Sequence, residues 1–143
     1  MWLIVCLALL FSGAQTVHAE TELPGAAQVE LFDTNKQKVV QTFANSSLFQ
    51  KQAKEILDSV SGRVQELSPS LENAMIAKIP LAPPQRMVHK GTGLDVEIAE
   101  MFVVMPKKGS RPPWLILITK EHETVIMEFS RKVDALRKQL RLS

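Results

Sequence analysis

Residues 94–129, LDVEIAEMFVVMPKKGSRPPWLILITKEHETVIMEF, contain three apolar runs separated by polar connections. The run at 94–105 alternates in its first half and is wholly apolar in its second, and runs at 114–119 and 124–129 follow. Alternation with a period of two predicts a strand with one buried face, whereas a wholly apolar run predicts a strand covered on both faces. Strands joined by short turns pair antiparallel. This half of the chain therefore predicts an antiparallel sheet.

Three more strands are expected before this stretch. Residues 28–33 and 38–43 are joined by a turn at 33–36, in which the side chains of Asp33 and Asn35 favour turn geometry, so the two segments predict a hairpin. Residues 75–81 alternate until Pro80, which lacks an amide hydrogen and therefore favours an edge position or a strand end. Residues 82–85, APPQ, predict an extended loop.

The segment 45–67 predicts one long amphipathic helix. Ser47 and Gln50 have the spacing of a capping box, in which each side chain bonds a backbone amide at the start of a helix. Apolar residues then recur at spacings of three and four, which is the period of one helical face: Phe49, Ala53, Ile56, Leu57, Val60, Val64 and Leu67. Residues 130–142 predict a second, short helix.

Together these elements predict an α+β fold. We expect a mainly antiparallel sheet of about five to six strands, with the long amphipathic helix and the short C-terminal helix on one face. The predicted organisation is a signal peptide at 1–19, a flexible lead at 20–27 and a single α+β domain at 28–143.

The first nineteen residues carry no charged side chain. An apolar run at 2–11 is followed by small residues that end in Val17-His18-Ala19, which is typical of a secretory signal cleaved between Ala19 and Glu20. The protein is therefore expected outside the cytoplasm. Because no basic residue precedes the apolar run, an uncleaved membrane tether is an alternative. A lipoprotein anchored at Cys6 is a third reading, although Cys6 lies near the start of the apolar core and not at its end.

The composition of the chain argues against disulfides in the mature protein and against nucleic acid as its partner. Cys6 is the only cysteine, so cleavage leaves a chain without disulfides. A formal net charge of +2 is too small to favour nucleic acid as a partner.

Enzymatic motifs are weak. His122 lies between Glu121 and Glu123, and His89 is the other histidine outside the signal. A metal needs three or four ligands from several places, and neighbouring side chains on a strand point to opposite faces. Among the acids, Asp95 and Glu97 fall on the solvent side of an alternating strand, and Glu100 follows them. We predict no catalytic residue, no metal ligand and no cofactor.

Two basic segments are candidate binding surfaces. The first comprises Lys107, Lys108 and Arg111 together with Trp114, and the second comprises Arg137, Lys138 and Arg141. Exposed basic and aromatic loop residues often contact partners, and cationic helices bind anionic surfaces. The structural alternatives are that Trp114 begins a buried strand and that the C-terminal cations complement the helix dipole.

Residues 29–57 and the run IAKIPLAPP at 76–84 resemble small exported proteins of unknown function from spore-forming Gram-positive bacteria. The resemblance implies no activity and no functional residue. The expected function is a non-enzymatic extracytoplasmic binding or envelope-associated module, with an envelope protein, an anionic wall polymer or a membrane surface as the partner. The alternative is an extracytoplasmic hydrolase or metal-dependent enzyme, which needs His89 or His122 to meet acidic side chains in a pocket.

Overall fold

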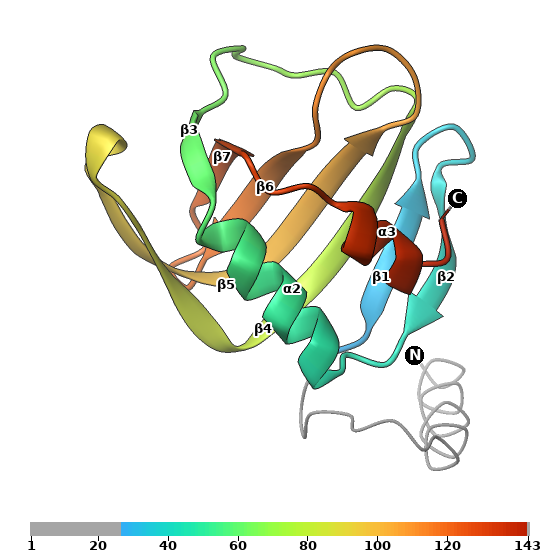
Figure 1. Ribbon diagram of the computed structural model, residues 1–143, viewed down its shortest axis with the longest axis horizontal. Coiled ribbons are helices and arrows are strands. Elements are labelled where there is room, and N and C mark those ends of the chain that lie inside the picture. Colours follow the sequence, from blue (N-terminus) through green and yellow to red (C-terminus); the bar gives the residue numbers. More distant parts are fainter. Residues whose placement is uncertain (1–26, 143) are drawn as a thin grey trace, which may run out of the picture.

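A single seven-stranded antiparallel sheet organises the protein (Figure 1). The computed structural model describes residues 27–142, so the predicted cleavage site at Ala19 and Glu20 lies outside the described residues. The strand order is β2-β1-β4-β5-β6-β7-β3. The strands are β1 (Val29–Asp33), β2 (Lys38–Phe43), β3 (Val60–Arg63), β4 (Ala74–His89), β5 (Leu94–Pro106), β6 (Trp114–Thr119) and β7 (Thr124–Phe129). A 3-10 turn, η2 (Lys90–Thr92), joins β4 to β5.

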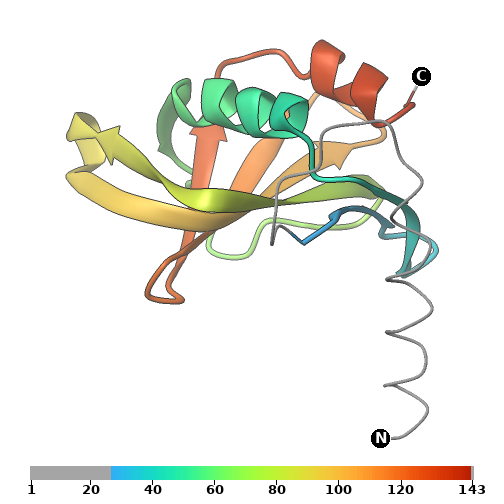
Figure 2. The ribbon, with the colours of Figure 1, turned by 90° about the horizontal axis from the view of Figure 1, so that it is seen from below.

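Two short helices, α2 (Ser47–Leu57) and α3 (Asp134–Gln139), lie on the same face of the sheet (Figure 2). The main core fills the space beneath them and contains fully buried residues such as Ile79, Met101 and Leu117. A smaller core lies on the opposite face, where the connection between β3 and β4 crosses the sheet (Figure 2). Its buried members are Ala74, Ile76, Val104 and Trp114.

The predicted α+β fold with one long amphipathic helix is wrong, because α2 ends at Leu57. Ser59 closes the helix by donating both its amide and its hydroxyl to the Ile56 carbonyl, at 3.0 Å and 2.9 Å. Val60–Arg63 then becomes β3, which pairs with β7 and brings the sheet to seven strands where five to six were predicted. A helix and a paired strand would both satisfy the backbone hydrogen-bonding groups of these residues, but as a strand they also cover the free edge of β7. Leu67, which was predicted on the buried helical face, is 100% exposed.

The start of α2 also differs from the prediction. Ser46, and not Ser47, is the N-cap, and its hydroxyl accepts a hydrogen bond from the Phe49 amide. Gln50 does not complete a capping box. Its side-chain amide instead donates to the carbonyl of Pro80 at 2.8 Å and to Asn45 Oδ1 at 2.7 Å. These contacts attach the start of the helix to β4.

Strand β4 continues through the segment that was predicted to be an extended loop. Its pairing with β5 shifts register between Pro80 and Gln85 and then resumes as far as His89. Its pairing with β1 ends at Lys78, just before Pro80, where a proline has no amide hydrogen to donate. The second helix is shorter than the predicted 130–142, because regular helix covers only Asp134–Gln139.

Two local predictions are confirmed. β1 and β2 form the expected hairpin, and the Asp33 side chain accepts hydrogen bonds from the Asn35 and Lys36 amides in the turn. The apolar half of β5 is covered on both faces, since Val103 lies in the main core and Val104 in the smaller one. Within residues 27–142 neither helix has the length and apolarity needed to span a bilayer.

Candidate functional site

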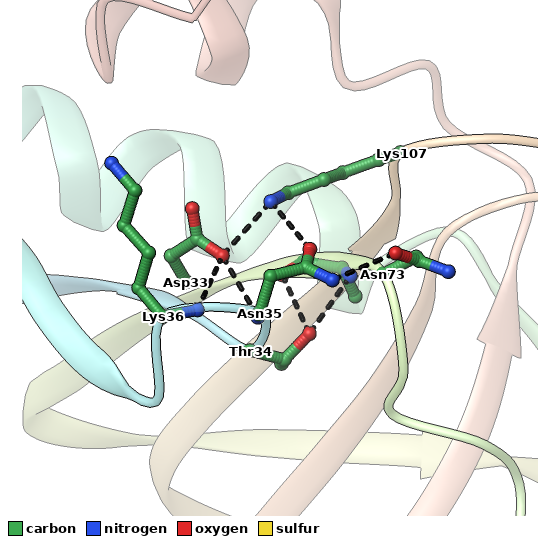
Figure 3. Close-up of polar contacts among 7 residues, drawn as sticks. Asp33, Thr34, Asn35, Lys36, Asn73 and Lys107 are labelled. Carbon is green, nitrogen blue, oxygen red and sulfur yellow. Dashed lines mark hydrogen bonds and ion pairs between the residues drawn. The ribbon is translucent and has the colours of Figure 1, made fainter.

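Three connections of the sheet meet in a polar cluster at one end of β1 (Figure 3). Lys107 Nζ donates to Asp33 Oδ1 at 2.8 Å and to Asn35 Oδ1 at 2.7 Å. The Asn35 side-chain amide donates to Asn73 Oδ1 at 2.7 Å, and the Thr34 hydroxyl bonds the backbone of Ala74. The cluster therefore joins the β1–β2 turn, the end of the β3–β4 connection and the start of the β5–β6 connection. Since the polar groups of the cluster form hydrogen bonds with one another, its role is structural. We call these residues, Asp33, Thr34, Asn35, Asn73 and Lys107, the clasp.

Asp33 is buried, and the hydrogen bond from Lys107 is the largest cause that holds the pKa of its carboxyl below the usual value. A lowered pKa in the folded state stabilises the fold above the unfolded-state pKa of about 3.9, and this contribution is lost as pH falls through the folded-state value. We therefore expect Asp33→Asn to be less stable than the wild type at pH 7 and to lose less stability on acidification. Urea unfolding between pH 7 and pH 2 measures both.

Lys107→Met supplies the matched variant. It removes the principal cause of the pKa shift and should flatten the same acidic part of the stability curve. If the free energy of unfolding falls equally with pH in the wild type and both variants, the hydrogen bond between Lys107 and Asp33 does not contribute to the acid dependence of stability.

The predicted basic binding segment is mostly occupied by contacts within the protein. Lys107 belongs to the clasp, and the Arg111 guanidinium lies 5.5 Å from the centre of the Trp114 ring while also forming an ion pair with Glu66. Trp114 is only 2% exposed and begins β6, which agrees with the alternative that it starts a buried strand. Lys108 is exposed. The structure therefore places only Lys108 of this segment in position to meet a partner.

The two histidines do not meet acidic side chains in a shared pocket. His89 Nδ1 lies 2.9 Å from the Thr92 hydroxyl at the end of β4, and His122 is exposed in the β6–β7 turn with a φ of 67°. Among the described residues, no three histidine, cysteine, aspartate or glutamate side chains gather as a metal-binding group would.

Acidic side chains near the β6–β7 turn line an open depression together with Arg86. Arg86 forms two hydrogen bonds with the Asp95 carboxylate, at 2.8 Å and 2.7 Å, and these hold the pKa of Asp95 below its usual value. Glu97 forms an ion pair with Lys120 at 3.6 Å. Glu100 pairs instead with Lys78 on β4, at 3.3 Å. Asp95, Glu97 and Glu100, the three acids of β5 noted in the sequence, are therefore each paired with a neighbouring cation.

The two helices carry the other predicted cations. They run in opposite directions and contact each other, so the end of α3 lies on the same side as the start of α2 (Figure 1). The buried side chains of α2 face the sheet, which leaves Lys51 on its outward side, and Lys138 is outward on α3 by the same geometry. We call the exposed surface of these two helical segments the helical face. Its exposed leucine and cations are Leu48, Lys51, Lys54, Arg131, Lys132, Lys138 and Arg141, and its exposed acids are Asp58 and Asp134.

Charge is distributed unevenly between the layers. The two helical segments, residues 47–58 and 130–142, contain seven cationic and three anionic side chains. Residues 27–46 and 59–129, which form the sheet and its connections, contain ten of each. The net positive charge of the described chain therefore resides entirely in the helical segments.

Two of the three acids in the helical segments form ion pairs within those segments. Glu55 pairs with Arg131, and Asp58 pairs with Lys54 at 3.2 Å. In residues 27–142, Lys51, Lys132, Lys138 and Arg141 form no ion pair. Arg137 is half-buried in α3. The helical face thus has several cations whose charge is not offset by a bonded carboxylate.

Sequence reasoning included Lys138 and Arg141 in the candidate surface but missed Leu48, Lys51 and Lys132. Leu48 was absent from the predicted buried stripe, and this was the available signal that an apolar residue of α2 points outward.

Comparison with known proteins assigns neither a family nor a function, because no protein-family model, no curated protein and no solved structure matches the chain.

Proposed function

We propose that the protein is an exported, non-enzymatic module that docks on an anionic, phosphate-rich surface of the cell envelope through its helical face. The observation that carries the proposal is the location of the net charge in residues 47–58 and 130–142, above a sheet whose charges balance. Cations gathered on one side orient a protein toward an anionic surface, whereas the same charges spread evenly would not. The signal-like segment at 1–19 supports the location.

No observation favours an enzyme. A hydrolase or metal-dependent enzyme needs His89 or His122 to meet acidic side chains in a pocket. Of the acids that line the depression near the β6–β7 turn, Asp95 is paired with Arg86 and Glu97 with Lys120. We therefore propose binding as the function.

The triple variant Lys51→Gln, Lys138→Gln, Arg141→Gln tests the proposal. Each cation near an anionic surface contributes about 1 kcal/mol, so the three changes are expected to weaken binding about 100-fold. The measurement is co-sedimentation of the full chain with phosphatidylglycerol vesicles and, in parallel, binding to soluble polyphosphate. Raising the salt concentration should weaken both interactions of the wild type.

The matched control is Lys36→Gln, Lys38→Gln, Lys90→Gln, which removes the same charge from three exposed positions elsewhere. This variant should bind within about threefold of the wild type. Its three changes weaken only the long-range attraction between the protein and the anionic surface, and salt screens that attraction. Equal losses in the two triple variants would refute docking through the helical face. Absence of binding of the wild type to both probes would refute the proposed function altogether.

A further inference from the structure

We infer that the anionic surface is a lipid bilayer and that Leu48 inserts among its acyl chains while the surrounding cations contact the headgroups. This inference rests on the proposed function and specifies what the helical face binds. It also assigns a role to a leucine of which the packing of the domain buries only about half.

Leu48 is 51% exposed on the second residue of α2. The next residue, Phe49, is buried. Leu48 therefore lies on the outward side of the helix and Phe49 on the side that faces the core. Lys51 lies three residues later on the same side as Leu48, within one turn. An apolar side chain therefore projects beside a cation whose charge is not neutralised by an ion pair in the described residues.

This pairing of a projecting apolar side chain with cations suits a bilayer better than a wall polymer. A membrane interface offers phosphate groups to the cations and hydrocarbon to the leucine at nearly the same depth. A flexible polyanion offers phosphates only and leaves the leucine in water. Burial of a leucine side chain is favourable in proportion to the area removed from water, so the two partners predict different effects of changing Leu48.

Leu48→Gln separates the two partners. Glutamine and leucine have similar helix propensities, so the fold is expected to keep its stability, and thermal unfolding checks this. Because about half of the side chain is already buried, we expect binding to phosphatidylglycerol vesicles to weaken about fivefold. Binding to polyphosphate should be unchanged.

Val88→Gln is the matched control. Val88 is 52% exposed on the β4–β5 hairpin, so it exposes an apolar side chain to the same degree away from the helical face. We expect it to bind vesicles as the wild type does. A second measurement uses Leu48→Trp, whose fluorescence should shift to higher energy on addition of phosphatidylglycerol vesicles and be quenched by brominated lipid, beyond any change in the unsubstituted chain.

The outcomes distinguish the inference from the proposed function. If Leu48→Gln binds vesicles as the wild type does while the triple variant of Lys51, Lys138 and Arg141 is weakened, insertion is overturned and electrostatic docking stands. Equal losses for Leu48→Gln and Val88→Gln, or an emission of the Leu48→Trp variant that lipid changes no more than that of the unsubstituted chain, also overturn insertion. Loss of all binding by the wild type overturns both. A selective loss for Leu48→Gln together with quenching of the introduced tryptophan supports the inference.

Discussion

Trp114→Ala is expected to lower the free energy of unfolding by about 3–5 kcal/mol, the range measured when a large aromatic side chain is removed from a core. Trp114 is 2% exposed and packs with Ala74, Ile76 and Val104 on the face of the sheet opposite the helices. Domains of this size are stable by about 5–15 kcal/mol, so one substitution would remove a large part of the total. The physical reason is the cavity that the alanine cannot fill.

Urea unfolding followed by far-ultraviolet circular dichroism measures this loss, because the substitution removes a fluorescent probe. Trp114→Phe is the control. Trp114 Nε1 is buried and has no hydrogen-bond partner in the described residues, so phenylalanine breaks no hydrogen bond and should cost less than half as much. An alanine variant with the wild-type urea midpoint would contradict the core role of Trp114.

Phe49→Ala is expected to destabilise the protein by a similar amount, about 3–5 kcal/mol. Phe49 is 3% exposed and is the first buried residue of α2. Its ring lies 5.8 Å from that of Phe43 on β2, centre to centre, with the planes tilted by 57°. This contact attaches the start of α2 to an edge strand, so its loss should loosen the part of the helix that carries Leu48 and Lys51.

Unfolding in urea, followed by the fluorescence of the intact Trp114, measures the effect. Phe49→Leu is the matched variant, because it keeps an apolar side chain of comparable reach and should cost clearly less than alanine. Equal stability of Phe49→Ala and the wild type would show that α2 is held by its hydrogen bonds to Pro80 and Ala82 and not by its apolar face.

The failed helix prediction shows where local pattern reasoning stops. Val60, Val64 and Leu67 continue the three-and-four spacing of α2, so a helix to Leu67 agrees with the sequence. The backbone groups of Val60–Arg63 nevertheless bond β7, which lies more than sixty residues further along the chain. Spacing cannot report that partner. β-Branched Val60 and Gly62, two residues later, both disfavour a helix slightly, and this was the weak signal against it.

The candidate sites show the same limit. Lys107 and Arg111 are basic loop residues by sequence, yet their partners Asp33 and Glu66 are 74 and 45 residues away in the chain. A cation that is paired inside the fold and a cation that is available to a ligand have the same sequence pattern. Leu48 and Lys51 were distinguishable from the core side of their helix by spacing, but their position beside α3 was not.

The sequence by itself determined the local features: the β1–β2 hairpin through Asp33, the two-faced burial of β5 and the buried stripe of α2 up to Leu57. Each depends on neighbours within a few residues, where backbone geometry limits the choices. Only the tertiary structure decided that Val60–Arg63 pairs with β7 and that Lys51 and Lys138 share one face. Hydrogen bonding across the sheet and charge proximity both depend on distance in space, and the positions of residues along the chain do not specify that distance.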